Sequence, residues 1–356
     1  MTRALPDLMT LLSDLVAIPG PPGQEERIRD YVEKAVQAIG CATRVDPRGN
    51  LLISAPGLAS VPHRADVVVM AHLDEIAMQV QQIDYDGCLR VVPMGGLFPW
   101  KCGEGPVLIM PVGEGATDLT GILSFGSIHT SSAASVITRA RESALTWDMV
   151  RVFTGLSPAE LNARNVRPGT RVVIHPSRRT LTRFGHHVAS PFLDDRADLA
   201  AMLVALQLLA DDGRDFSHIV FAATAAEEVG GHGALYMLRR LQPEVGIALE
   251  IGPSVPESDF MPDSQPTVWV TDSYSAIRAS DSGLLAEAAE EAGFDVHWQA
   301  LTRGGSDASC AASHGLLARP ITLAFAAENS HGYEIMHQDA VRNLARFLTA
   351  VLERVP

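Results

Sequence analysis

The chain has 356 residues and a formal net charge of −14, from 28 basic and 42 acidic side chains. Hydrophobic residues make up 47% and charged residues 20%, which is typical of a globular protein and excludes a disordered or fibrous chain. The acidic balance argues against nucleic acid or an anionic membrane surface as the main partner. No stretch approaches the roughly 18–20 uninterrupted apolar residues of a transmembrane helix.

The amino-terminal part predicts two helices over residues 5–40, separated by Pro19–Gly23, with Glu25 and Glu26 at the start of the second helix. The first of them carries Asp7 and Asp14 and no long apolar core, so we expect no signal peptide and a cytoplasmic protein. Four cysteines without a CxxC pair fit a reducing compartment and make a thiolate zinc site improbable. Strands follow at 51–54 and 67–71, the second being a buried apolar run.

A different pattern begins near residue 77, where short strands alternate with Gly/Pro turns and one helix covers 157–165. Beyond residue 186, strands and helices alternate, which indicates an α/β sheet. We expect strands at 218–224, 246–252, His297–Ala300 and 320–326, and helices at Asp195–Asp211, after Gly233, at Gly283–Gly293 and at Gln338–Arg354. The sequence therefore predicts one α/β domain, 1–76 plus 187–356, interrupted by a β-rich insert at 77–186.

Polar residues follow the predicted strands, and active sites of open α/β sheets lie at the carboxyl ends of strands. His72 and Asp74 end one strand on the same face, so Asp74 can orient the imidazole of a ligand histidine. The alternative is a polar pair that caps a loop. Asp194 and Asp195 precede the predicted amphipathic helix, where one can act as the N-cap while the other reaches a cation.

Glu227 and Glu228 follow a buried strand, and burying both without cations is costly. One can bind a metal while the other faces a bound water, although a solvated acidic turn is the alternative. Glu250 interrupts an apolar strand and needs a metal, an Arg or a hydroxyl partner unless it already reaches water. His331 follows another buried strand, and His337 is interpreted as a helix-start residue.

A Gly-rich loop with Gly305 and Asp307 either lines a substrate pocket or is a plain turn. Two histidines with several carboxylates and no cysteine suit Zn²⁺, Co²⁺ or Mn²⁺. The carboxylates exceed what one zinc ion needs, which indicates two ions that share a bridging carboxylate.

Six segments in order, AHLDE, FLDDRA, EEVGGHGA, LEIGP, GGSDA and SHGYE, resemble the M42 metallo-aminopeptidases. That family includes the tetrahedral aminopeptidases and proteins described as glutamyl aminopeptidases or endoglucanases. The resemblance extends over nearly the whole chain. It implies a mixed-sheet, zinc-peptidase-type catalytic domain, a PDZ-like insert used for dimerisation, and homo-oligomers up to dodecamers.

The resemblance also implies a role for each matching residue. His72 and Glu250 would bind one metal ion, Glu228 and His331 the other, and Asp194 both. Glu227 would be the general base, Asp74 would orient His72, and Gly305 and Asp307 would contact substrate. Where this chain has Glu250, the family often has Asp.

The function expected is hydrolysis of amino-terminal residues from peptides by a dinuclear metal site, a metal-bound water and a glutamate base. A related amidohydrolase acting on modified or acylated peptides would share every ligand and remains the alternative. A non-catalytic scaffold fits poorly with intact base and ligand positions. An endoglucanase would leave the histidines idle.

Overall fold

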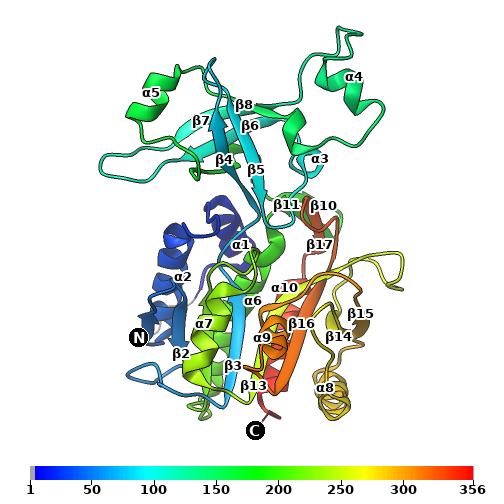
Figure 1. Cartoon of the computed structure of the whole chain (residues 1–356). Helices are drawn as coiled ribbons and strands as arrows, with labels where there is room; N and C mark the ends of the chain where they lie inside the picture. Colours follow the sequence, from blue (N-terminus) through cyan, green and yellow to red (C-terminus); the bar gives the residue numbers. More distant parts are fainter. Residues whose placement is uncertain (1–4, 356) are drawn as a thin grey trace. The chain divides into compact units, whose positions relative to one another are not determined.

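The fold is described from a computed structural model, which describes residues 5–355 (Figure 1). The chain divides into two compact units, one made of the chain up to Asp74 together with the chain from Leu181 onward, the other of Glu75–Thr180. The corresponding predicted insert is 77–186. Within residues 5–355, no helix is long and apolar enough to cross a membrane.

The larger unit is built on an eleven-stranded mixed sheet, as predicted. Four neighbouring strands at its centre run parallel: β12 (Ile219–Thr224), β3 (Val67–His72), β13 (Val245–Pro253) and β16 (Arg319–Glu328). The sheet continues beyond β12 through β2 (Leu51–Ser54) and β1 (Thr43–Val45), and beyond β16 through β17 (Tyr333–His337), β11 (His187–Pro191) and β10 (Thr182–Phe184). Two more strands, β14 (Pro266–Thr271) and β15 (His297–Ala300), join alongside β16.

Helices cover both faces of this sheet (Figure 1). Because successive strand side chains alternate between faces, Val67 and Val69 pack in one core and Val68 and Met70 in another. The first core contains α1 (Leu8–Ala17), α2 (Glu26–Ile39), α6 (Leu193–Asp212), α8 (Ala279–Ala292) and α10 (Ala340–Leu352). The second contains α7 (His232–Leu241) and α9 (Asp307–Ser313). The strands that are continuous apolar runs in the sequence are therefore those covered by helices on both faces of the sheet.

The predicted amphipathic helix after Asp194 is wrong in one respect, because α6 is buried on nearly all sides. It packs against β3 and β13 and is itself covered by α1, α2 and α10. Its run of Ala and Leu residues fits that central place, since a helix that is apolar on all sides is a buried one. By contrast, α2 buries one stripe, Ile28, Val32, Val36 and Ile39, as a surface helix does.

The smaller unit is a closed six-stranded antiparallel barrel. Its strands, in barrel order, are β4 (Ala77–Ile83), β5 (Leu89–Met94), β8 (Arg151–Phe153), β7 (Leu119–Ser124), β6 (Gly105–Met110) and β9 (Arg171–Ile174). The short helices are α3 (Pro99–Cys102), α4 (Val136–Ala140) and α5 (Pro158–Ala163), with 3₁₀ turns η1 (Trp147–Met149) and η2 (Pro176–Arg178). The predicted β-rich texture is confirmed, and a PDZ-like topology stays a prediction.

Helix α5 coincides with the one helix predicted in this unit, and Ser157 and Glu160 form a capping box at its start. A buried ion pair between Arg179 and Glu75 joins the two ends of the segment. Closure of the barrel leaves no free sheet edge, which is how such a short set of strands avoids edge pairing.

Several elements differ from the sequence prediction. Strands β1, β10, β11, β14 and β17 were not predicted, and α9 begins within the segment interpreted as a loop. Helix α8 begins at Ala279, four residues before the predicted start. His337 is the last residue of strand β17 and does not start a helix, so that interpretation is wrong. Helix α10 begins three residues later, at Ala340.

Candidate metal centre

The predicted site residues gather at the carboxyl edge of the four parallel strands. His72 ends β3, Glu250 lies in β13, and Glu228 follows β12. His331 comes just after β16. The hydrogen-bonded register of β3 and β13 ends at the pair Met70 and Ala248, two residues before His72 and Glu250. The strands therefore separate where these two side chains lie, which leaves room between them for polar groups.

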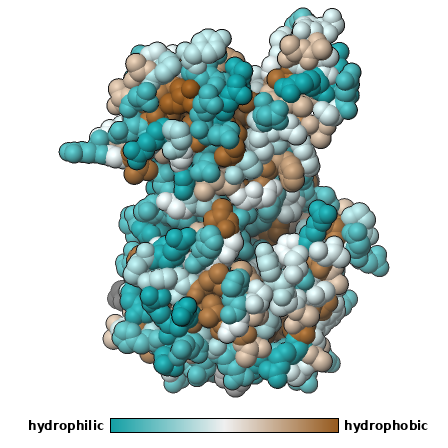
Figure 2. Space-filling model, in the orientation of Figure 1, coloured by the Kyte–Doolittle hydropathy of each residue, from teal (hydrophilic) through white to brown (hydrophobic). Residues whose placement is uncertain are grey.

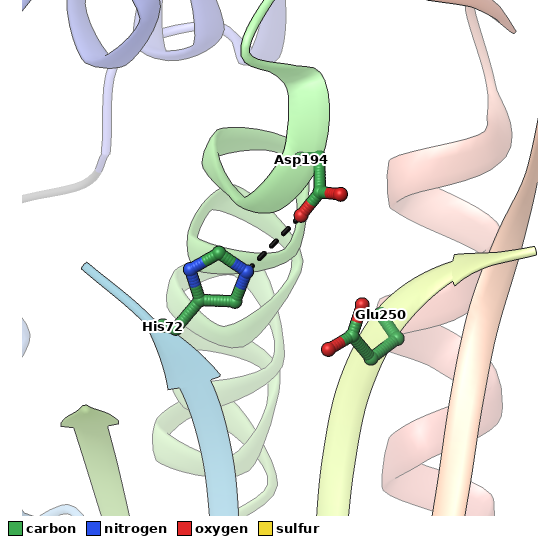
Figure 3. Close-up of side chains that lie close together, drawn as sticks. All are labelled: His72, Asp194 and Glu250. Carbon is green, nitrogen blue, oxygen red and sulfur yellow. Dashed lines mark hydrogen bonds and ion pairs between the residues drawn. The ribbon is translucent and has the colours of Figure 1, made fainter. Parts of the chain in front are cut away.

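The first candidate group consists of His72, Asp194 and Glu250, whose ligand atoms all lie within 4.8 Å of one another. All three residues are buried. The Nε2 atom of His72 is 3.0 Å from Oδ1 of Asp194. Figure 3 shows the three side chains converging from β3, from the start of α6 and from β13.

The second candidate group consists of Asp194, Glu228 and His331, again within 4.8 Å. The Nε2 atom of His331 is 3.5 Å from Oδ2 of Asp194 and 4.0 Å from Oε2 of Glu228. Asp194 thus directs one carboxylate oxygen toward each histidine. The structure brings together all five residues for which the resemblance implies metal binding, in two groups that share Asp194.

Asp74 borders the two groups and contacts three nearby residues, His72, Glu227 and Glu228. The Nδ1 atom of His72 is 2.9 Å from the backbone oxygen of Asp74 and 3.6 Å from its carboxylate. That carboxylate accepts hydrogen bonds from the backbone N–H groups of Glu227 and Glu228, at 2.9 and 3.1 Å. The hydrogen bond to the histidine ring thus comes from the Asp74 backbone oxygen, and the predicted role of its carboxylate in orienting His72 stays a prediction. Asp74 also holds the glutamate pair, which the sequence did not indicate.

The prediction that Asp194 or Asp195 caps the following helix is wrong. The N-cap of α6 is Phe192, and it makes no side-chain capping hydrogen bond. Both aspartates have non-helical backbone angles and lie at a kink near the start of this helix. Asp194 reaches the histidines, and the carboxylate of Asp195 accepts a hydrogen bond from the backbone N–H of His72.

The residues predicted to contact substrate lie at the start of α9. Asp307 is its first residue and is buried. A side chain at Gly305 would meet the ring of Tyr274, since an added Cβ would lie 2.1 Å from it. A packing requirement therefore explains the glycine, and a substrate role for either residue stays a prediction.

Crowded carboxylates dominate the electrostatics of the centre. Burial raises the pKa of Glu227 and of Glu250 well above the usual range, and raises that of Glu228 to about 7. Burial lowers the pKa of His72, but surrounding carboxylates, Asp195 foremost, outweigh it and hold that pKa well above its usual range. The centre thus contains more negative charge than its two histidines can neutralise.

Two residues of the centre's surroundings have no role in the sequence prediction. Glu334, on β17, accepts hydrogen bonds from the backbone N–H groups of Asp194 and His331. Asn50 accepts from the N–H of Ala225 and donates to the carbonyl of Gly233, so it spans the loop that carries the glutamate pair. Glu334 lies within the SHGYE segment, but nothing in the sequence indicates what its carboxylate contacts.

Comparison with known proteins identifies the family of this chain. A family model described as M42 glutamyl aminopeptidase matches residues 49–347. The chain belongs to this family. It is similar to a lysyl aminopeptidase of Pyrococcus furiosus, with 30% identity over 243 residues, 68% of this chain and 65% of that enzyme. That match spans just under two thirds of the lysyl enzyme. A glutamyl aminopeptidase of Lactococcus lactis is 24% identical over 70% of this chain and 67% of its own length.

Solved structures of TET peptidases share the fold. A TET aminopeptidase from a marine sediment Thaumarchaeota archaeon superposes with a TM-score of 0.86 at 18% identity, over 98% of this chain and 96% of its own. The TET1 peptidase of Pyrococcus horikoshii, described as assembling into a tetrahedron or a large octahedral shell, gives a TM-score of 0.83 at 22% identity, over 97% and 99%. At these identities the likeness shows the fold.

Proposed function

We propose that this protein is a dinuclear metallo-aminopeptidase that removes amino-terminal residues from peptides. Peptidases of the M42 family depend on metal ions. The observation that carries the proposal is the pair of ligand groups that share Asp194. One bridging carboxylate between two sets of His and carboxylate donors is the arrangement that two-metal hydrolases use.

The donors fit two divalent cations. Each group offers one imidazole nitrogen and carboxylate oxygens and no thiolate, a set that suits Zn²⁺, with Co²⁺ or Mn²⁺ as alternatives. The raised pKa values of Glu228 and Glu250 point the same way, because these buried carboxyls lack enough positive charge around them to ionise at their ordinary pH. The Glu250 carboxylate lies close to His72 and Asp194 in the first group, although its side chain is one methylene longer than the Asp that the resemblance implies.

When bound, the cations would polarise the scissile carbonyl and make a water molecule acidic. In our proposal, Glu227 accepts the proton of the attacking water at its carboxylate and returns it to the leaving amine. Its place supports this role, because its backbone N–H is held by Asp74 while its side chain lies outside both ligand groups. Asp74 and Asp195 keep His72 in place from two sides, through its ring and its backbone N–H.

The decisive experiment compares free and blocked substrates. The purified protein is stripped of metal, reconstituted separately with Zn²⁺, Co²⁺ and Mn²⁺, and tested on an aminoacyl-anilide panel beside N-acylated controls. We expect two ions per chain and activity on the free-amine substrates. Activity confined to blocked substrates would favour the related amidohydrolase instead. A folded protein inactive on both would favour a scaffold.

Glu227→Gln tests the proposed base. We expect kcat to fall by about 10²–10⁴, because proton transfer to a positioned side chain contributes about that much. Metal content should stay at the wild-type value, since Glu227 belongs to neither ligand group. Full activity in this variant would contradict the mechanism.

We further propose that the protein is a homo-oligomer assembled with the barrel unit as an interface. This unit exposes large apolar side chains, including Phe98 and Trp100 at 54% each. Ile122 and Phe153, at 45% and 52%, are directly opposite on β7 and β8. Figure 2 shows hydrophobic patches among hydrophilic residues on the visible face of this unit. Sedimentation velocity at micromolar concentration should give a dimer or a dodecamer, and a monomer would contradict the proposal.

The cytoplasmic location stays a prediction.

A further inference from the structure

Glu334 is a buried carboxylate beside the candidate metal centre that belongs to neither ligand group. It lies on β17 opposite Ser190 of β11 and is 1% exposed. Its neighbour Tyr333 is exposed, whereas Met336 is buried on the same strand. The alternation of the strand therefore turns the Glu334 side chain inward, where an unpaired carboxylate would be costly.

The two oxygens of this carboxylate accept from two different segments. Oε2 accepts from the backbone N–H of Asp194 at 3.0 Å, and Oε1 accepts from the backbone N–H of His331 at 2.9 Å. Asp194 is the residue shared by both ligand groups, and His331 belongs to the second group alone. One side chain thus fixes the backbone positions of two candidate ligands that are 137 residues apart in the sequence.

Both segments have backbone conformations that need support. His331 has φ 58° and Asn329 has φ 63°, in the left-handed region that side chains other than glycine seldom occupy. Phe192 has φ 65°, and Asp194 itself departs from helical angles although it lies at the start of α6. Such conformations persist where the surrounding structure holds them, and they cluster at functional sites.

We propose that Glu334 is a positioning residue that holds Asp194 and His331 at the separation required by the second metal ion. This inference rests on the proposed function, because it assigns Glu334 a task at the same centre. Hydrogen bonds from two N–H groups to the two oxygens of one carboxyl group fix both distance and direction. Since His331 occurs only in the second group, loss of Glu334 should weaken that site more than the site of His72 and Glu250.

Cobalt titration of the metal-free protein tests the proposal. Wild-type protein should bind two equivalents, followed by the visible absorption of bound Co²⁺. In Glu334→Gln, the side-chain amide keeps one acceptor and places an NH₂ group against the other N–H. We expect one equivalent to bind about 10–100-fold more weakly, with an altered spectrum, as is usual when an outer partner of a metal ligand is removed. Glu334→Asp, too short to reach both N–H groups, should shift binding in the same direction.

Asp281→Asn provides the matched control. Asp281 is equally buried and accepts hydrogen bonds from Arg319, at the amino-terminal end of β16 and thus at the opposite edge of the sheet. This variant should bind two equivalents as the wild type does. The proposal would be overturned if Glu334→Gln bound cobalt with the wild-type affinities and spectrum. It would also be overturned if the Glu334 and Asp281 variants weakened the binding of both equivalents to the same extent.

Hydrogen exchange on the metal-free wild type gives a test that needs no variant. The N–H groups of Asp194 and His331 should exchange at least about 100-fold more slowly than those of an exposed loop, because Glu334 holds both without metal. Exchange at the exposed-loop rate would overturn the proposal. A wild-type protein that binds no cobalt would contradict the proposed function alone, and the exchange rates would still decide whether Glu334 holds the two segments.

Discussion

Asp74 connects three parts of the centre through one side chain and one carbonyl. Its backbone oxygen and carboxylate face the His72 ring, and its carboxylate also accepts from Glu227 and Glu228. Asp74→Asn would keep one acceptor oxygen and lose the charge. We expect metal affinity to fall about 10–100-fold, because the support for a ligand histidine is lost. Competition with a chelator measures this, and unchanged affinity would show that the backbone oxygen alone is sufficient.

Glu25 predicts a pH dependence of stability. It lies in the segment between α1 and α2, is 5% exposed, and burial followed by the nearby charge of Asp74 raises its pKa to about 7. When the folded-state pKa of a carboxyl is raised, its protonated form favours the folded protein. This contribution is complete below the unfolded-state pKa, near 4.5, and is lost as the pH rises through about 7. The wild type should lose up to about 3 kcal/mol over that range relative to Glu25→Gln.

Urea unfolding of the metal-free protein at pH 4.5 and pH 8 measures this difference. Glu26→Gln is the control, because Glu26 is the exposed neighbour of Glu25 and its charge contributes least to the raised pKa, so most of the pH dependence should remain. If Glu25→Gln and the wild type lose the same free energy of unfolding, the carboxyl of Glu25 titrates normally in the folded protein.

At the residue scale, the sequence indicated which side chains matter more readily than what they contact. The chemistry of His72, Asp194 and Glu228 is visible in their types and in their places after strands. The contacts of Glu334 and Asp195 are not, because each involves a backbone N–H of a distant segment. Which N–H a buried carboxylate meets depends on how strands and helices pack, and no local pattern records it.

The turn from β12 into α7 shows how an element places the glutamate pair. Gly233, in α7, packs so closely that an added Cβ would lie 2.1 Å from the Ala225 carbonyl and 2.3 Å from Oδ1 of Asn50. Gly233→Ala should therefore destabilise the protein by about 2–3 kcal/mol and lower activity, because the displaced loop carries Glu227 and Glu228.

Gly283→Ala is the matched substitution in another helix. Gly283 lies inside α8, and an added Cβ there meets nothing within 4 Å. Alanine should stabilise the helix by about 0.5–1 kcal/mol and leave activity unchanged. Thermal unfolding and a rate assay on both variants provide the measurement. Equal effects from the two substitutions would contradict the close approach at Gly233.

At the element scale, periodicity predicted the strands and helices that contribute most of the core. The apolar runs at β3, β12 and β13 and the stripe of α2 have strong local signals. Strands β10 and β11 have weak ones, because β11 pairs with β17, which is distant in the chain, and β10 lies at the sheet edge paired with β11 alone. Helix α9 was not predicted because it is short and follows two glycines.

For the whole molecule, metal binding and pH should be linked. In the metal-free protein, burial raises the pKa of Glu228 to about 7 and that of Glu334 to about 8. The protonated forms favour the folded state below about pH 4.5, and this contribution is lost as pH rises through 7–8. Cations favour the ionised forms. Metal should therefore raise the melting temperature more at pH 8 than at pH 5.5.

Calorimetry of the metal-free and the zinc- or cobalt-loaded protein at the two pH values measures this linkage. The loaded protein of the Glu227→Gln variant serves as a control, because its two ligand groups are intact. A larger stabilisation by metal at pH 5.5 would contradict the sign argued here, and equal stabilisation at the two pH values would mean that the buried carboxyls are already ionised in the metal-free protein.

The sequence by itself determined the class of fold, the family and the residue types of the centre, because strand runs, helix stripes and short ordered segments are local in the chain. Tertiary structure decided that Asp194 faces both histidines, that neither aspartate caps α6, and that Glu334 accepts from two ligand segments. These facts depend on where β3 and β13 separate and on how β17 lies against β11, which are relations between segments far apart in the sequence.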